Sequence, residues 1–161
     1  MSILISNRQH RERIPTENLR RKANLILNAL GCPEGELSVV IVDEHEITNI
    51  NREYLHRSGP TNVISFAMTE GQFSDVNPHL LGDVIICADT ARKEAEIGGI
   101  SFKSRFDALL IHGILHLFGY DHENAADEAV CMDAKAAELE ALIIDEIEAD
   151  EDAEETGNPG S

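Results

Sequence analysis

The segment from Ala108 to Phe118 (ALLIHGILHLF) constrains the fold of this chain more than any other. It predicts a helix that is apolar nearly all round, and such a helix is buried in the core of a protein. His112 and His116 are its only polar side chains. Because burying a polar group is costly unless the group is paired, the sequence predicts a central helix whose two histidines need a partner.

The spacing of these histidines is typical of a metal site. His112 and His116 lie four positions apart, so their side chains share one face of the helix. Two imidazoles so placed can bind one zinc ion with zinc–nitrogen bonds of about 2.1 Å. Gly119 allows the helix to end in a left-handed residue, and His122 follows as a third ligand. We therefore predict that one Zn²⁺ ion is bound; an ordinary core histidine is the alternative for either helical residue alone.

Three protein ligands leave the fourth position of a tetrahedral zinc ion to water, as in catalytic sites. Because the three ligands are neutral, the ion keeps its charge, lowers the pKa of bound water to about 7 and stabilises charge on a phosphoryl oxygen. Metzincin proteases share the spacing, but they carry their general base, a Glu, directly after the first His. Gly113 occupies that position here. A metallohydrolase of peptides or small molecules is therefore a disfavoured alternative.

The rest of the chain predicts a single α/β domain. Residues 37–42 (LSVVIV) are apolar on both faces, which indicates a strand covered on two sides. Thr16 and Asp43 are expected to cap helices. Strands are expected at 3–6, 37–42, 62–68 and 83–88, and helices at about 16–30, 44–54, 89–98, 104–118 and 124–144. This order favours a small mixed sheet of about four strands, with helices packed around it and a central metal-binding helix.

The formal net charge of −17 is unevenly distributed. Residues 145–161 carry eight acids and no base, whereas the first 22 residues carry six bases and two acids. The acidic segment has too few apolar groups to offset its ordering entropy, so we predict a disordered tail after a domain at 1–144. Lys and Arg supply most non-specific affinity for phosphate. Any nucleic acid must therefore be bound locally, through a metal or a small basic segment, or within a larger complex.

Composition also bears on location. The chain opens without a basic, apolar and then small-residue leader, and no run approaches the ~18 apolar residues of a membrane-spanning helix. Cys32, Cys87 and Cys131 form no CxxC pair, which argues against a disulfide framework or a thiolate zinc site. We expect a cytoplasmic protein with no membrane partner.

The segment HGILHLFGYDH at 112–122 resembles the signature of the YbeY family, bacterial zinc-dependent endoribonucleases of single-stranded RNA. PTNVISF at 60–66, LGDVIIC at 81–87 and ADTARKEA at 88–95 are similar to further family motifs in the same order. The resemblance spans roughly residues 3–143. It implies a four-stranded mixed sheet, action on the 3′ end of small-subunit rRNA and a role in ribosome quality control. The implied partners are rRNA and the small ribosomal subunit or its proteins; DNA is not expected.

The resemblance fails at one position of the second predicted helix. The family commonly has an Arg directly after the Tyr of this helix, whereas Tyr54 is followed here by Leu55. No catalytic arginine is therefore assigned to position 55. Arg57, two residues on, is the candidate to reach the same cleft, and an ordinary surface arginine is the alternative.

Three further residues are candidates for the cleft. Asp121 is either a hydrogen-bond partner for a ligand imidazole or the cap of the next helix. Asn62 and Ser65 either face the cleft from the third strand or serve packing and hydrogen bonding. The histidines that have no partner spacing are expected at the surface. These are His10, His45, His56 and His79.

Two classes of function remain open. In the first, zinc assists cleavage of a phosphodiester in RNA: zinc-bound hydroxide attacks phosphorus, or zinc activates the ribose 2′-OH and a cyclic phosphate results. In the second, the protein is a ribosome-biogenesis factor that acts by binding and whose zinc is structural. Leu55 and the acidic surface favour the second class, whereas an open fourth position on zinc favours the first.

Overall fold

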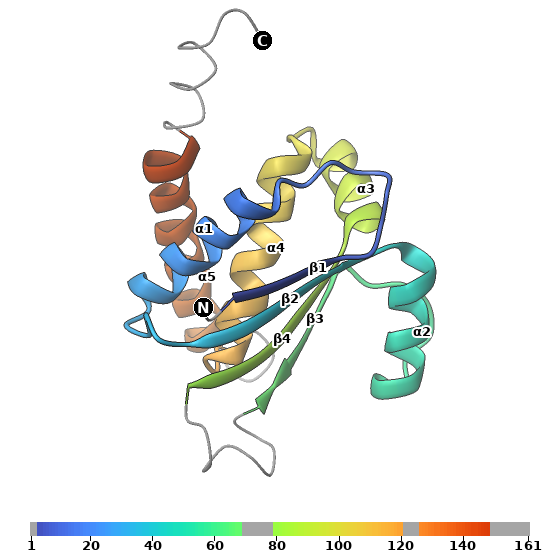
Figure 1. Ribbon diagram of the computed structural model, residues 1–161, viewed down its shortest axis with the longest axis horizontal. Helices are drawn as coiled ribbons and strands as arrows, with labels where there is room; N and C mark the ends of the chain where they lie inside the picture. The colour runs from blue at the N-terminus through green and yellow to red at the C-terminus, as the bar shows by residue number, and fades with distance from the viewer. Residues whose placement is uncertain (1–2, 69–78, 121–125, 149–161) are drawn as a thin grey trace, which may run out of the picture.

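The computed structural model describes residues 3–68, 79–120 and 126–148 (Figure 1). The strands are β1 (Ile3–Asn7), β2 (Glu36–Val42), β3 (Val63–Ala67) and β4 (Leu80–Cys87). The helices are α1 (Thr16–Ala29), α2 (Glu44–Leu55), α3 (Ala88–Gly98), α4 (Phe102–Leu117) and α5 (Ala126–Ile143), followed by a π-helix, η2 (Ile144–Glu148). The predicted order of elements is confirmed. No helix within the described ranges is both long and apolar enough to cross a membrane.

The four strands form one mixed sheet in the order β1-β2-β4-β3. β1 and β4 each run parallel to β2, and β3 runs antiparallel to β4. β3 is therefore an edge strand that pairs with β4 alone. The predicted mixed α/β sheet of four strands is confirmed.

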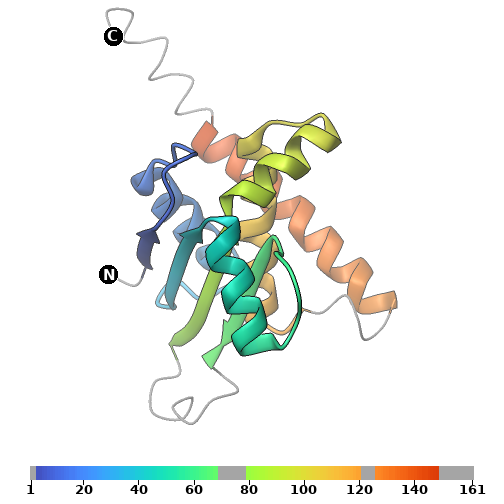
Figure 2. The same ribbon diagram turned by 90° about the vertical axis from the view of Figure 1, so that its right-hand side faces the viewer.

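Helices cover both faces of this sheet. Val84 and Ile86 of β4 face the larger core, which α1, α4 and α5 complete, whereas Ile85 and Cys87 face α2. Figure 2 shows α2 in front of the sheet and α4 behind it. β2 is also buried on both faces, as its apolar sequence predicts. The faces matter for function because they separate α2 from α4.

The predicted N-terminal caps of the helices are confirmed in part. Asp43 caps α2 as predicted, since its carboxylate accepts a hydrogen bond of 2.8 Å from the N–H of Glu46. The prediction for Thr16 is wrong: Thr16 is the first residue of α1, and Pro15 precedes it without a side-chain cap. α4 starts at Phe102, earlier than expected, because the hydroxyl of Ser101 accepts from the N–H of Ser104 at 3.0 Å.

The first residues of the acidic segment are helical. Residues 144–148 continue the helical path of α5 as η2, beside α1. Ile147 is only 3 % exposed, so the burial of this apolar side chain offsets the ordering entropy of its acidic neighbours. Residues 145–148, which were expected in a disordered tail, are therefore ordered. Residues 149–161 lie outside the described part of the chain, so a disordered tail there stays a prediction.

A buried ion pair joins α1 to α4. The Nζ of Lys22 donates to both carboxylate oxygens of Asp107, at 3.0 and 3.3 Å. The two side chains are only 8 % and 7 % exposed. A buried charge is costly unless it is paired, so this contact fixes one arrangement of α1 against the helix that carries the histidines.

Removal of one partner of this pair is expected to destabilise the fold. Lys22→Ala leaves the Asp107 carboxylate buried without its ammonium partner, which lowers the free energy of unfolding by about 3–5 kcal/mol. Urea denaturation measures the change. The control is Lys93→Ala, whose ion pair with Glu44 is exposed and whose loss should lower the unfolding free energy by no more than about 1 kcal/mol. An equal, small effect of both substitutions would contradict the structural role of the buried pair.

Candidate metal centre on helix α4

Helix α4 makes its closest approach to the sheet at Gly113. A Cβ atom on this residue would lie 2.5 Å from Cγ1 of Val84 and 3.2 Å from Cγ2 of Val63. Position 113 therefore points directly at β3 and β4. A glycine inside a helix costs about 1 kcal/mol relative to alanine, and the close contact of helix and sheet offsets this cost. A Glu in this position, as in metzincins, would have no room.

The rotation of α4 at Gly113 decides where the histidines point. Successive helix residues are rotated by about 100°, so Leu110 and Ile114 lie on one flank, where both are fully buried on the side of α1. His112 and His116 lie together on the opposite flank, beside the outer edge of β3. His112 is half-buried and His116 is exposed. We call this pair the histidine face.

The exposure of the histidine face corrects one expectation. The sequence predicts two histidines inside a fully buried helix, whereas the structure places them at the rim of the core. The reason is that α4 packs over β4 and the edge strand β3, so one flank of the helix is only partly covered. His116 is therefore accessible to solvent, and His112 is accessible in part.

The end of α4 follows the sequence closely. Gly119 has a φ of 93°, in the left-handed region, as predicted. The N–H of Gly119 donates to the carbonyl of His116 at 3.0 Å, and the N–H of Tyr120 donates to that of Leu115 at 3.1 Å. These two bonds are those of a Schellman motif, which ends the helix directly after the histidine face.

The predicted ligand set extends beyond the described residues. Asp121 and His122 lie outside them, so the third ligand and its hydrogen-bond partner stay predictions. Within the described ranges no three His, Cys, Asp or Glu side chains gather as a metal site. The residues present nevertheless suit zinc: two imidazoles share one accessible flank, and residues 108–118 contain no charged side chain that would repel the ion.

Ser65 and Asn62 make hydrogen bonds that hold the edge strand in place. The Ser65 hydroxyl donates to the carbonyl of Gly113 at 2.8 Å. The Asn62 amide nitrogen donates to the carboxylate of Glu94 at 3.2 and 3.3 Å, and the Nε of Arg105 donates to the same carboxylate at 3.0 Å. Ser65 thus lies on the α4 side of β3, but its hydroxyl and the Asn62 amide bind protein groups. These contacts support the packing interpretation of both residues.

Arg57 lies in the exposed loop after α2. His56 before it ends the helix with a φ of 56°, and the N–H of Arg57 donates to the carbonyl of Asn51 at 3.2 Å. The side chain of Asn51 donates to the carbonyl of Gly59 at 3.0 Å. This loop therefore folds back on the end of α2, and a contact of the Arg57 guanidinium with the histidine face stays a prediction.

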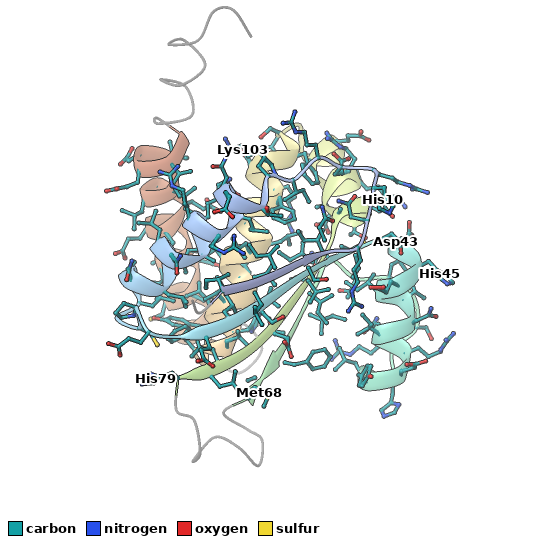
Figure 3. The ribbon with its side chains drawn as sticks, viewed as in Figure 1. His10, Asp43, His45, Met68, His79 and Lys103 are labelled. Atoms are coloured by element: carbon teal, nitrogen blue, oxygen red, sulfur yellow. The ribbon has the colours of Figure 1, made fainter. Side chains whose placement is uncertain are left out.

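The four other histidines lie at the surface, as predicted. His10, His45, His56 and His79 are all exposed. Figure 3 shows the three that it labels, His10, His45 and His79, at the periphery of the structure. His112, by contrast, is half-buried, so α4 is the element that places a histidine next to the core.

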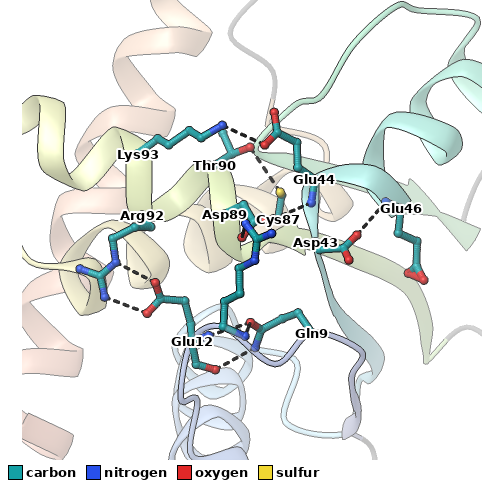
Figure 4. A network of polar contacts seen from close by, with 11 residues as sticks. Gln9, Glu12, Asp43, Glu44, Glu46, Cys87, Asp89, Thr90, Arg92 and Lys93 are labelled. Atoms are coloured by element: carbon teal, nitrogen blue, oxygen red, sulfur yellow. Dashed lines mark hydrogen bonds and ion pairs between the residues drawn. The ribbon is translucent and has the colours of Figure 1, made fainter.

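Sequence reasoning missed a polar cluster at the carboxyl ends of β1, β2 and β4 (Figure 4). This edge of a parallel sheet commonly binds ligands. Here its charges bind one another: Arg92 donates to both Glu12 oxygens at 2.7 and 2.8 Å, and Lys93 donates to Glu44 at 2.8 Å. Asp89 accepts from the N–H of Glu44 at 2.9 Å. These contacts tie the N-terminal segment to α2 and α3, a structural role.

Four pKa values in this cluster are shifted. Hydrogen bonds to Glu12 and Glu44 raise the pKa values of Arg92 and Lys93. Hydrogen bonds from Arg92 lower the pKa of the Glu12 carboxyl below its ordinary value, although partial burial opposes them. Burial raises the pKa of the Cys87 thiol, against a hydrogen bond from Thr90. Because the thiolate is the reactive form of cysteine, Cys87 is a packing residue and not a nucleophile.

Gly113→Ala tests the close approach of α4 to the sheet. Alanine favours a helix over glycine, but its Cβ overlaps Val84, so we expect a net loss of about 1–3 kcal/mol in unfolding free energy. The matched control is Gly98→Ala in α3, where a Cβ meets nothing within 4 Å; this variant should be neutral or more stable. Thermal and urea denaturation measure both. A stabilised Gly113→Ala protein would contradict the packing described.

The ion pair of Glu12 and Arg92 should stabilise the fold in a pH-dependent manner. Because the folded-state pKa of Glu12 is lowered, its contribution is present above the unfolded-state pKa and is lost as the pH falls through the folded-state value. A double-mutant cycle of Glu12→Gln and Arg92→Gln should give a favourable coupling at pH 7 that vanishes in acid. Urea titrations from pH 7 to 3 measure it. A coupling that is constant with pH would contradict this assignment.

Comparison of the sequence with known proteins gives a family match and relatives that share one description. A family described as Endoribonuclease YbeY matches residues 4–143. A relative from Geobacter metallireducens named Endoribonuclease YbeY is 57 % identical over 144 residues, which are 89 % of this chain and 96 % of the relative. Another of the same name, from Syntrophotalea carbinolica, is 52 % identical over 145 residues, 89 % of this chain and 97 % of the relative.

Comparison with solved structures finds a protein with the same fold. A Thermotoga maritima protein solved in solution superposes with a TM-score of 0.67 at 24 % identity, over 92 % of this chain and 93 % of that one. At this identity the likeness concerns the fold alone. The family match spans all four strands, α4 and the histidine motif. The chain belongs to the Endoribonuclease YbeY family.

Proposed function

We propose that this protein is an endoribonuclease that cleaves single-stranded RNA with one zinc ion held by His112, His116 and His122. The observation that carries the proposal is the histidine face: two imidazoles on the accessible flank of an otherwise buried helix. Membership of an endoribonuclease family supports RNA as the substrate.

The residues around the histidine face suit hydrolysis of a polymer. A zinc ion held by three neutral imidazoles would lower the pKa of bound water to about 7 and stabilise charge on a phosphoryl oxygen. His116 is exposed, so a bulky RNA chain can approach this flank. Gly113 faces the sheet and offers no general base, which argues against the cleavage of peptides.

The cellular role that we propose is rRNA maturation at the 3′ end of small-subunit rRNA, together with ribosome quality control in the cytoplasm. The small ribosomal subunit or its proteins would be the partners. The charge of the chain supports a partner: at a net −17, the protein has little general attraction for phosphate. Affinity for one RNA site is then supplied by the metal and by a surrounding complex.

A second candidate is a ribosome-biogenesis factor that binds RNA or the subunit without cleaving it. Leu55 favours it, because this position commonly holds an arginine in the family. The bonds that occupy the Ser65 hydroxyl and the Asn62 amide also leave fewer polar groups to contact a substrate. Direct measurement of cleavage separates the two candidates.

His116→Ala is the decisive variant. Wild-type protein should carry one zinc ion per chain and cleave a labelled fragment of small-subunit rRNA; the variant should lose the zinc and at least about 100-fold of the rate. Elemental analysis and gel assays measure both. His10→Ala, at an exposed position, is the matched control and should behave as wild type.

The outcomes separate the candidates. Equal cleavage by wild type and His116→Ala would show that a contaminant is responsible and would overturn the zinc-nuclease proposal. Binding of small subunits by both proteins, without cleavage by either, would favour the binding factor. A single deoxyribose at the scission site should abolish the cyclic-phosphate route and spare direct hydrolysis.

A further inference from the structure

The outer edge of β3 presents backbone groups that β4 does not use. The N–H of Cys87 donates to the carbonyl of Asn62 at 2.9 Å, and the register places Val63 opposite Ile86. In an antiparallel pair, hydrogen-bonded and non-hydrogen-bonded residues alternate. The hydrogen-bonded residues of β3 are therefore Ile64 and Phe66. It follows that the N–H and C=O groups of residues 63, 65 and 67 point away from the sheet.

Two of these outward N–H groups have no acceptor in the described part of the chain. The N–H of Val63 donates to its neighbour's side chain, the Oδ1 of Asn62, at 2.7 Å, which agrees with its outward direction. Among the described residues, the N–H groups of Ser65 and Ala67 do not donate to a backbone carbonyl outside the sheet. Both residues are partly exposed. The edge thus offers two donors and three carbonyl acceptors in a row.

This edge lies directly beside the histidine face. The side chains of Val63 and Ser65 touch α4 at Gly113, and His112 and His116 lie on the flank of α4 that faces away from α1. A polymer that follows β3 would therefore pass the histidines. The backbone groups of β3 that bind the polymer and the histidines that hold the proposed metal would then lie on the same side of the molecule.

Charge supports an anionic occupant. Edge strands are commonly protected by charged side chains or proline, but β3 reads VISFA and contains neither. The neighbouring residues 108–118 of the metal helix also carry no acid. In a protein of net charge −17, residues 63–67 and 108–118 offer an RNA chain an approach without an acidic side chain. The one acid of α4, Asp107, is bound by Lys22 on the side of α1.

We propose that the free edge of β3 binds the extended backbone of single-stranded RNA. The N–H groups of Ser65 and Ala67 donate to phosphate or base oxygens, and the carbonyls of residues 63, 65 and 67 accept from ribose hydroxyls or base amino groups. Strand edges bind extended peptides through main-chain bonds, and backbone N–H groups also donate to the phosphate oxygens of nucleic acids. The inference rests on the proposed function and adds to it the surface that holds the substrate. It predicts preference for single strands with little sequence selectivity.

Amide hydrogen exchange tests the edge without a mutation. NMR of the full chain, with its metal, follows the amides of β3 with and without excess single-stranded RNA. We expect RNA to slow exchange at Ser65 and Ala67 by at least about fivefold, as one added hydrogen bond would. The matched controls are Ile64 and Phe66, whose N–H groups already bond to β4 and should change less.

Each outcome of this experiment bears either on the inference about β3 or on the proposed function. Unchanged exchange at Ser65 and Ala67, in a sample that still cleaves RNA, would overturn the inference and leave the proposed function intact. A sample that neither binds nor cleaves RNA would overturn the proposed function, and the inference with it. Protection of the same amides by an extended peptide but not by RNA would reassign the edge to a protein partner.

Ala67→Pro adds a test by substitution. Proline removes an outward N–H and is tolerated where this group does not bond within the sheet. We expect the KM for RNA to rise about threefold to tenfold, as for one lost hydrogen bond, with kcat within about twofold of wild type. Ala67→Val keeps the N–H and should retain the wild-type KM. A folded Ala67→Pro protein with unchanged KM would contradict the inference; if it does not fold, the exchange experiment decides.

Discussion

The contact between Gly113 and the two strands beneath it is the constraint on which the site depends. With no side chain at 113, α4 lies close to Val84 and Val63, and this contact sets the rotation of the helix about its axis. One flank is then fully buried toward α1, and the opposite flank carries both histidines at the rim. A larger residue at 113 would lift or turn the helix and move the imidazoles with it.

Charged side chains are distributed unevenly over the molecule. Acids and bases pair with each other at the carboxyl ends of the parallel strands, where Arg92 holds Glu12 and Lys93 holds Glu44. β3 and residues 108–118, which carry the histidine face, by contrast have no Asp, Glu, Lys or Arg. In the proposed function, RNA would approach the protein at this uncharged place, and the proposed metal would supply positive charge there.

Local signals in the sequence were sufficient for most of the fold. The apolar strand 37–42, the cap at Asp43 and the left-handed Gly119 were all predicted, because each depends on neighbours along the chain. Thr16 was misassigned because its backbone is already helical and Pro15 starts the helix. The helical conformation of residues 145–148 was not predicted. It depends on the burial of Ile147 against parts of the fold that are distant in the sequence.

The sequence by itself determined the order of the elements, the two histidines on one helical face and the turn that ends their helix. These features follow from helical period, apolar pattern and backbone preference, which are local. Only the tertiary structure decided that the histidine face lies at the rim of the core, that Ser65 and Asn62 hold the edge strand, and that β3 has a free edge. Those features follow from which elements become neighbours, and no local pattern fixes the order of strands in a sheet.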